Sequence, residues 1–257
     1  MSSKSLHIGI LCAMPEEIGC FLENLNNISE FKYGDLKIFS GNWKYSSSEK
    51  SDLLISIAWS GWGKVSAARA TTRLISIPDK EKIDLLLFTG VAGSADSSKS
   101  QWDIVIADKI VQHDMDARPI FKKFEIPSLK KSFLSPSESW INWAKSTIKK
   151  AFLSNKMSSF HKIHTGIIAT GDQFISDKFT LAELSRNLPG ISAVEMEGAA
   201  FAQVACQENI SWLVIRVISD NADDSAAQSF NEFLSEYKFE SNKLLKALIG
   251  NYDNAPW

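Results

Sequence analysis

Apolar runs of strand length recur along the chain and alternate with segments whose apolar residues repeat at helical spacing. We predict strands within 6–14, 36–41, 52–61, 84–89, 103–108, 165–175, 191–197 and 212–220. We predict helices over 64–76, 136–153, 178–188, 198–209 and 230–249. Strands that are apolar throughout and alternate with helices are typical of a largely parallel sheet covered on both faces. No internal repeat or linker divides the chain, so we expect one α/β domain over residues 1–257.

Several of the predicted strands end in a cluster of small or polar residues. These clusters are AMPEE at 13–17, SGWGK at 60–64, TGVAG at 89–93, ATGDQF at 169–174, VEME at 194–197 and ISDNAD at 218–223. In open α/β sheets, ligands bind beyond the carboxyl ends of the strands. We therefore expect these clusters to meet on one side of the sheet.

The connecting segments show three further patterns. Pro15 suits the first turn of a helix, and Glu16 and Glu17 would favour that helix through its dipole. Segment 118–131 mixes prolines, aromatics and lysines, which predicts a long loop of the kind that often serves as a lid or an interface. The serine-rich stretches 45–51 and 95–100 are typical of solvated turns.

The composition narrows the class of protein. With 44% hydrophobic and 23% charged residues, the chain is expected to form a packed core. The net charge of -2 comes from mixed acids and bases, so no nucleic-acid surface is expected. No apolar run approaches the roughly 18 residues of a membrane span, and the N-terminus lacks the apolar region of a signal peptide. We expect a cytosolic protein that contacts neither nucleic acid nor membrane.

The cysteines and histidines show no pattern of a disulfide or a metal site. Cys12, Cys20 and Cys206 are odd in number and lie in apolar or amphipathic segments, which predicts buried thiols in a reducing compartment. The four histidines lack metal-ligand spacing, and the glycines form no phosphate-binding motif. We therefore expect no metal and no cofactor.

The acids at the strand ends allow two interpretations from the residues alone. Asp220 could cap a helix, and Glu17 could complement a helix dipole. A carboxyl group buried at a strand end would instead have a raised pKa, as a proton donor near neutral pH requires. Arg216 lies inside an apolar strand and must be paired there, with Glu195 and Glu197 as candidate partners.

Seven motifs, taken together, resemble a known family. AMPEE, SGWGKVSAA, TGVAG, HDMD, TGDQFI, AVEMEGAA and RVISDNAD occur in the order, and at about the spacing, of the 5'-methylthioadenosine/S-adenosylhomocysteine nucleosidases, within the nucleoside phosphorylase fold family. The resemblance runs from about His7 to the last predicted helix. It implies a single α/β domain with a central mixed, barrel-like β-sheet surrounded by helices. It also implies a homodimer that hydrolyses the N-glycosidic bond between adenine and a 5'-modified ribose.

The resemblance assigns roles to individual acids. Breaking this bond leaves positive charge on the ribose and negative charge on the purine, so a proton donor and a base for water both help. Asp220 matches the acid that donates to adenine N7, and Glu17 matches the base that activates water. Glu197 and Met196 match the ribose-binding pair, because a carboxylate can accept both the 2'- and 3'-hydroxyls.

Other positions match residues around the substrate. Phe174 matches the aromatic that packs on the purine, and Ile175 matches a residue whose backbone reads the adenine edge. A phenylalanine beside an isoleucine is otherwise more often plain core. Gly93 matches a glycine that allows close backbone approach to the ligand. Three residues are placed near the 5'-substituent, namely Met14, Trp62 and Phe230. Two more are expected to support the substrate-contacting groups, namely Glu195 and Arg216.

The chain departs from the family pattern at three places. Val91 stands where many members have serine or threonine, which removes a hydroxyl near Asp220. Trp62 stands where a small aliphatic residue is common, so it could narrow the 5' pocket or stack on a larger group. Segment 118–129 differs from the family's commonest loop and could change which 5'-substituents are accepted.

Three alternative functions remain open at this point. A nucleoside phosphorylase needs cationic donors where water would sit, but the first strand-end cluster offers Glu16 and Glu17 and no arginine. A hydrolase of another 5'-modified adenosine, of the futalosine type, would keep the same chemistry. A non-catalytic nucleoside-binding protein would have no need of Glu17, Glu197 and Asp220 together.

Overall fold

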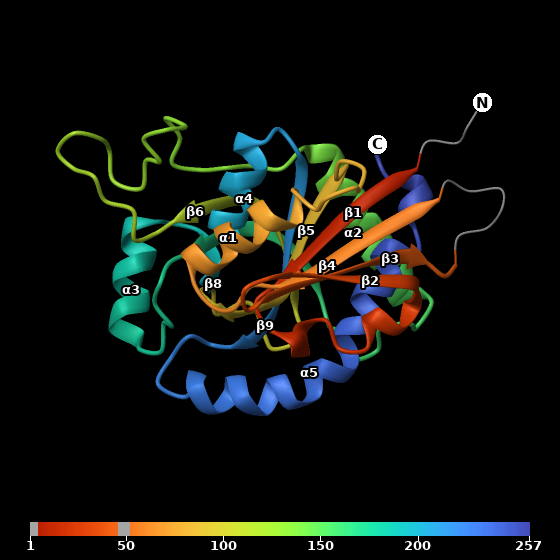
Figure 1. The fold of residues 1–257 in the computed structure, drawn as a ribbon. Helices are drawn as coiled ribbons and strands as arrows, with labels where there is room; N and C mark the ends of the chain where they lie inside the picture. The colour runs from red at the N-terminus through yellow and green to blue at the C-terminus, as the bar shows by residue number, and fades with distance from the viewer. Residues whose placement is uncertain (1–4, 46–51) are drawn as a thin grey trace.

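The computed structural model describes residues 5–45 and 52–257 (Figure 1). From residue 46 onward, the turn predicted at 45–51 lies outside these ranges. The strands are β1 (Leu6–Cys12), β2 (Leu25–Tyr33), β3 (Leu36–Trp43), β4 (Leu53–Trp59), β5 (Leu85–Ser94), β6 (Ile104–Gln112), β7 (Ile163–Thr170), β8 (Ile191–Glu195) and β9 (Ser211–Asp220). The helices are α1 (Lys64–Leu74), α2 (Glu138–Leu153), α3 (Lys178–Asn187), α4 (Gly198–Gln207) and α5 (Ala226–Ile249).

The strands form one mixed sheet that closes on itself. Their order is β2-β3-β4-β1-β5-β8-β7-β6-β9, and β5 also pairs with β9, which closes the second half into a barrel. The barrel-like mixed sheet that the family resemblance implied is thereby confirmed. The largely parallel sheet that the apolar pattern alone suggested holds for the pairs β1–β4, β1–β5, β5–β9, β6–β7 and β7–β8. The remaining pairs are antiparallel, among them β6 with β9 and β8 with β5. The apolar pattern indicates that both faces of the sheet are covered, but it does not indicate the direction of each strand.

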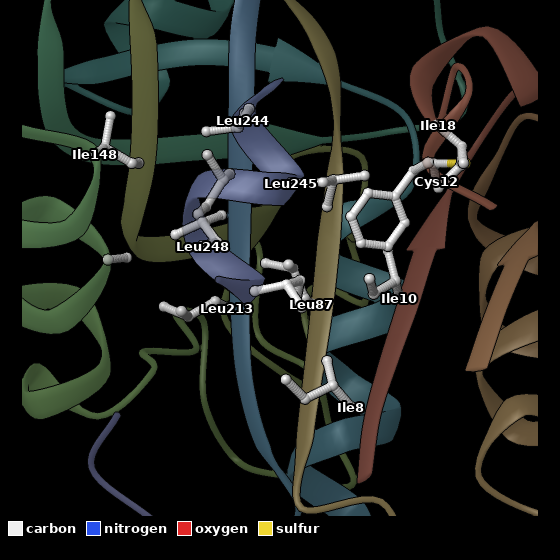
Figure 2. Close-up of a cluster of buried hydrophobic side chains, with 14 of the residues drawn as sticks. Ile8, Ile10, Cys12, Ile18, Leu87, Ile148, Leu213, Leu244, Leu245 and Leu248 are labelled. Carbon is white, nitrogen blue, oxygen red and sulfur yellow. The ribbon is translucent and has the colours of Figure 1, made fainter. Parts of the chain in front are cut away.

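Alternate side chains of the central strands enter two different cores. Ile10 and Leu87 belong to the core that also contains Leu245 of α5 (Figure 2). Leu86 and Phe88, on the opposite face of β5, belong to the core under α1 and α4. Burial on both faces explains why these strands are apolar throughout, and each fully buried side chain of this size contributes about 1.5–3 kcal/mol.

The structure adds one strand to the predicted elements and lengthens one helix. The pattern did not predict β2, an edge strand with most of its side chains exposed, which pairs with β3. Its polar sequence carries little apolar periodicity, so only the pairing reveals it. Helix α5 begins at Ala226, one turn before the predicted start at Phe230. No helix within the described ranges is long and apolar enough to cross a membrane.

The helix predicted after the first strand is also corrected. The chain forms two short 3-10 turns instead, Pro15–Glu17 and Phe21–Asn24. Gly19 lies between them with a φ of 56°, a left-handed conformation that interrupts a helix. A Cβ at Gly19 would also lie 2.4 Å from the carbonyl oxygen of Lys238 on α5, so close packing requires this glycine.

The prediction that the three cysteines are buried holds only in part. Cys12 is buried as predicted, but Cys206 is only partly buried and Cys20 is exposed, so the prediction is wrong for Cys20. Amphipathic segments leave one side in solvent, and the sequence did not show which side holds Cys20.

The segment 118–131 is irregular, as predicted, and projects from the body between β6 and α2 (Figure 1).

Candidate active site

The carboxyl ends of the strands surround a cavity. All six strand-end clusters contribute residues to its wall, so the predicted convergence is confirmed. The cavity is lined by eleven of the twelve predicted site residues: Met14, Glu17, Trp62, Gly93, Phe174, Ile175, Glu195, Met196, Glu197, Asp220 and Phe230. The twelfth, Arg216, lies behind the wall and contacts the carboxylates described below.

Glu17 is buried and held by backbone donors from the turn after β1 and from β5. The turn after β1 folds its side chain back, so that Oε2 accepts the N–H groups of Ala13 at 2.7 Å and Met14 at 3.0 Å. Oε1 accepts the N–H of Val91 at 2.9 Å. Burial raises the pKa of Glu17, against the opposing effects of Arg216 and these three donors. The carboxyl group therefore has a fixed orientation and a pKa above its ordinary value.

Gly90 makes this arrangement sterically possible. A Cβ at this position would lie 2.3 Å from Glu17 Oε1 and 2.4 Å from Arg216 Nη1. Any larger residue would displace both charged groups. The sequence reasoning did not single out Gly90, although the two glycines of TGVAG were a visible signal of close approach.

Arg216 lies fully buried among three carboxylates. Its Nη2 donates to Glu195 Oε2 and lies 3.4 Å from Glu197 Oε2, and its Nη1 lies 3.9 Å from Glu17 Oε1. The guanidinium carbon lies 4.4 Å from the ring centroid of Phe88. Burial alone would lower the pKa of Arg216, but the three carboxylates outweigh burial and raise it. The prediction that Arg216 is paired with Glu195 and Glu197 is confirmed.

Glu195 positions the start of α4. Its Oε2 accepts the N–H groups of Glu197 at 3.1 Å and Gly198 at 2.8 Å. Its Oε1 accepts the hydroxyl of Thr170, whose Oγ1 in turn accepts the N–H of Ala199 at 2.9 Å. These bonds satisfy donors at the helix N-terminus and fix the residue that follows β8. The sequence reasoning missed Thr170, because a threonine at a strand end carries no specific signal.

Glu197 lies between this cluster and the turn before α1. Its Oε1 accepts the N–H of Gly63 at 2.9 Å, and Gly63 has a φ of 91° that favours glycine. Burial raises the pKa of Glu197, and the charge of Glu195 raises it further, against the opposing effect of Arg216. Met196 beside it is half-buried and faces the same cavity.

Asp220 ends β9 and is buried next to a hydroxyl. Its Oδ2 accepts the hydroxyl of Ser219 at 2.7 Å, and its Oδ1 accepts the N–H of Ala222 at 2.8 Å. Burial raises the pKa of Asp220, although both hydrogen bonds oppose the shift. Val91 lacks the hydroxyl that many family members have near this acid, and Ser219 supplies a hydroxyl to Asp220 instead. The sequence analysis did not single out Ser219, although it directly precedes Asp220. Asp220 caps a turn and not a helix, because α5 begins only after Ser225.

Gly93 and Ile175 form close-packed parts of the wall. Gly93 pairs with Val194 on β8 and with Asp220 on β9, at the point where the barrel strands meet. A Cβ at Gly93 would lie 2.9 Å from Asp220 Oδ1. Ile175 is buried and follows Phe174 in the turn after β7. The backbone is thus close to the acid on one side of the cavity.

Three aromatic side chains form the rim of the cavity. The ring centroid of Phe230 lies 5.8 Å from that of Phe174 and 6.0 Å from that of Trp62, both in edge-to-face geometry. Phe174 is 39% exposed and Trp62 51% exposed, and Met14 beside them is partly buried. The rim is therefore apolar and open on its outer side.

The charge of the cavity limits the chemistry that it supports. Four carboxyl groups line it, and none of the described residues in its wall is a lysine, arginine or histidine. Such a site can transfer protons and stabilise positive charge, whereas it repels phosphate. In the described part of the chain, no group of three or more histidine, cysteine and acidic residues could hold a metal ion.

Comparison with known proteins shows which families this chain is related to. Residues 7–250 match the model of the phosphorylase superfamily. The chain is 33% identical over 243 residues to a 5'-methylthioadenosine/S-adenosylhomocysteine nucleosidase of Staphylococcus aureus (strain JH9), covering 94% of this chain and 98% of the relative.

Solved structures agree with this relationship. A nucleosidase of the same description from Colwellia psychrerythraea 34H, in complex with adenine, superposes with a TM-score of 0.82 at 31% identity and covers 97% of each chain. The futalosine hydrolase of Helicobacter pylori strain 26695 superposes with a TM-score of 0.81 at 32% identity, over 96% of this chain and 98% of that one. The chain therefore belongs to the phosphorylase superfamily and, within it, to the 5'-methylthioadenosine/S-adenosylhomocysteine nucleosidase family.

Proposed function

We propose that this protein hydrolyses the N-glycosidic bond of 5'-methylthioadenosine and S-adenosylhomocysteine, releasing adenine and the 5'-thio-substituted ribose. One observation carries the proposal: Glu17, Glu197 and Asp220 line the same cavity, each buried and each with a raised pKa. Membership of the nucleosidase family supports the substrate class.

Asp220 acts as the general acid. Burial favours its neutral form, so it retains a proton at a pH where an exposed aspartate would be ionised. It donates that proton to N7 of the departing adenine as the C1'–N9 bond breaks. Ser219 holds the carboxyl group in place while negative charge moves onto it.

Glu17 and Glu197 act on the sugar side. Glu17 accepts a proton from the water that attacks C1', and its raised pKa makes it a stronger base than an exposed glutamate. Glu197 and Met196 hold the ribose, with the carboxylate accepting its hydroxyls. The carboxyl groups around Arg216 also stabilise the positive charge that develops on the ribose.

The remaining residues of the cavity wall hold the two ends of the substrate. Phe174 and Ile175 bind the purine, and Met14, Trp62 and Phe230 surround the 5'-substituent.

The proposal is tested by measuring adenine release from 5'-methylthioadenosine by the purified protein in phosphate-free buffer. We expect multiple turnovers without phosphate, and added phosphate should produce no ribose 1-phosphate. A strict requirement for phosphate would contradict hydrolysis and favour a phosphorylase. Binding without any turnover would favour a non-catalytic nucleoside-binding protein.

A second candidate keeps the chemistry and changes the 5'-substituent. The similarity to a futalosine hydrolase is as high as that to the nucleosidases, and the rim at Trp62 and Phe174 is open to solvent. A panel of 5'-methylthioadenosine, S-adenosylhomocysteine, adenosine, AMP and a futalosine analogue separates the two. The substrate with the highest kcat/KM identifies the 5'-substituent for which the site is built.

We further propose a homodimer located in the cytosol. The dimer follows from the family resemblance, and the exposed free thiol of Cys20 suits a reducing compartment. Light scattering should give about twice the 28.6 kDa chain mass. A monomer mass at micromolar concentration would contradict the dimer.

A further inference from the structure

One lysine and two aspartates that have no role in the proposed reaction join three of the sequence motifs. Lys64 ends SGWGK, Asp114 lies in HDMD and Asp172 lies in TGDQF. Lys64 Nζ lies 2.6 Å from Asp114 Oδ1 and 3.9 Å from Asp172 Oδ2. The Lys64 N–H donates to Asp172 Oδ1 at 2.7 Å, and the Asp172 N–H donates to Asp114 Oδ2 at 3.0 Å. We call these three residues the clamp.

The clamp holds the start of the turn that faces the purine. Residues 171–177 connect β7 to α3 and bring Phe174 and Ile175 to the cavity. Between Gln173 and Ser176, no backbone–backbone hydrogen bond ties this turn to the rest of the described chain. Hydrogen bonds hold the ends of the turn: the Gly171 N–H donates to the Glu195 carbonyl oxygen at 3.1 Å, Asp172 belongs to the clamp, and Asp177 is the N-cap of α3. Between these ends, the turn is held by packing of the buried Ile175 and of Phe174 against Phe230.

Lys64 occupies a position that its local structure disfavours. It is the first residue of α1, where the positive end of the helix dipole repels a cation, and the N-cap Gly63 has no side chain to cap the helix. Asp172 supplies the missing cap from another part of the chain. Burial alone would raise the pKa of Asp114, but Lys64 and the Asp172 N–H outweigh burial and lower it. With side chains 18% and 24% exposed, Lys64 and Asp114 interact more strongly than a solvated surface pair.

The turn before α1 also contacts Glu197, the carboxylate assigned to the sugar. Gly63, directly before Lys64, donates its N–H to Glu197 Oε1 at 2.9 Å. A Cβ at Gly63 would lie 3.0 Å from Asp172 Oδ1, so the two segments are in close contact. The clamp thereby connects the purine-facing turn to the residue that holds Glu197.

We propose that Lys64 is a positioning residue, and that the clamp sets the spacing between the purine-facing turn and Glu197 and so determines how tightly adenine is bound. This inference rests on the proposed function. Lys64 does not line the cavity, and the residues that break the bond, Asp220 and Glu17, are held by bonds that do not involve it. Loss of Lys64 should therefore weaken base binding and leave the chemical step largely intact.

The test compares Lys64→Met with a matched control, Lys243→Met, which removes a lysine paired with Glu240 on α5, away from the cavity. The measurements are the Kd for adenine by titration calorimetry, and KM and kcat for 5'-methylthioadenosine. In Lys64→Met we expect Kd and KM to rise about tenfold, the size of one charge-assisted hydrogen bond, with kcat changed less than about threefold. Lys64→Arg should restore most of the affinity, and Lys243→Met should match the wild type.

The outcomes separate the two proposals. If the wild type releases adenine and Lys64→Met binds adenine with an unchanged Kd, the clamp is wrong and the proposed function stands. A fall in kcat at unchanged KM would also overturn the positioning role. If the wild type neither binds nor releases adenine, the proposed function fails and the role of the clamp fails with it. Should Lys64→Met not fold, Asp114→Asn is measured instead, and the same split between KM and kcat decides.

Discussion

The floor and the rim of the cavity are built in opposite ways. The floor consists of Arg216, Glu17, Glu195, Glu197 and Asp220. These side chains are almost fully buried, and each is held by several donors or acceptors. On the rim, Trp62 is 51% and Phe174 39% exposed, and both contact Phe230 in edge-to-face geometry. The floor is thus organised before any ligand arrives, whereas the rim has room to adapt.

This difference indicates how reaction and selectivity are divided. Buried and fixed charges are where a reaction gains most, because they need no reorganisation as charge develops. Apolar contacts discriminate between substrates by smaller factors. We therefore expect variants of the floor to affect turnover or folding strongly, and variants of the rim to change substrate preference modestly.

Asp220→Asn should have the largest effect on the reaction. The amide oxygen can still accept the Ala222 N–H, and the amide N–H can donate to Ser219 Oγ, so the fold should be retained. The variant has no proton to donate, and we expect kcat to fall by about 10²–10⁴-fold, the range of general acid catalysis. Steady-state adenine release with a thermal melt as fold control measures this, and a near-normal kcat would remove Asp220 from the mechanism.

Arg216→Met should have the largest effect on stability. It leaves three buried carboxylates without their cation, and breaking a buried ion pair in this way costs about 3–5 kcal/mol. Arg69→Met is the matched control, because Arg69 pairs with the exposed Asp35 and its loss should cost less than about 1 kcal/mol. Chemical denaturation of both variants measures the difference. Equal stability of the two would mean that the floor is not held by Arg216.

Trp62→Ala should change selectivity without unfolding the protein. Loss of the indole removes apolar contact from the short methylthio group, so kcat/KM for 5'-methylthioadenosine should fall about tenfold. The longer tail of S-adenosylhomocysteine extends further and should be affected less. Phe179→Ala, an 89% exposed residue of α3 outside the cavity wall, is the control. A loss of equal size for both substrates would show that Trp62 does not discriminate between 5'-substituents.

The pH dependence of stability should show the smallest effect. The folded state raises the pKa of Asp220, so the protonated carboxyl contributes stability that is fully present below its ordinary value of 3.8 and is lost as pH rises through the folded-state pKa. Asp220→Asn does not ionise, so its Tm should exceed that of the wild type by an increasing margin as pH rises, by about 2–4 °C or less. A constant difference between pH 4 and pH 8 would contradict a raised pKa.

The family-specific motifs were predictable because each lies at the end of an apolar strand. AMPEE, VEME and ISDNAD were visible as polar interruptions of buried runs, and Arg216 was recognisable as a cation that needs partners. Ser219, Thr170 and Gly90 were not singled out. The importance of Thr170 comes from a contact with Glu195, distant in sequence, and that of Gly90 from space that a Cβ would fill, and neither is a property of the local sequence. Ser219 directly precedes Asp220, but a serine at the end of a strand does not by itself indicate which way its hydroxyl points.

The sequence by itself determined the alternation of strands and helices, the two-sided burial of the strands and the convergence of the strand ends, because these follow from apolar periodicity. Only the tertiary structure decided the strand directions, the closure of the barrel between β5 and β9, and the replacement of the first helix by two short turns. It also decided that three glutamates share one buried arginine, and that Lys64 meets Asp114 and Asp172. The physical reason is that pairing between distant segments depends on their packing in space, whereas local patterning reports only which side of each segment is buried.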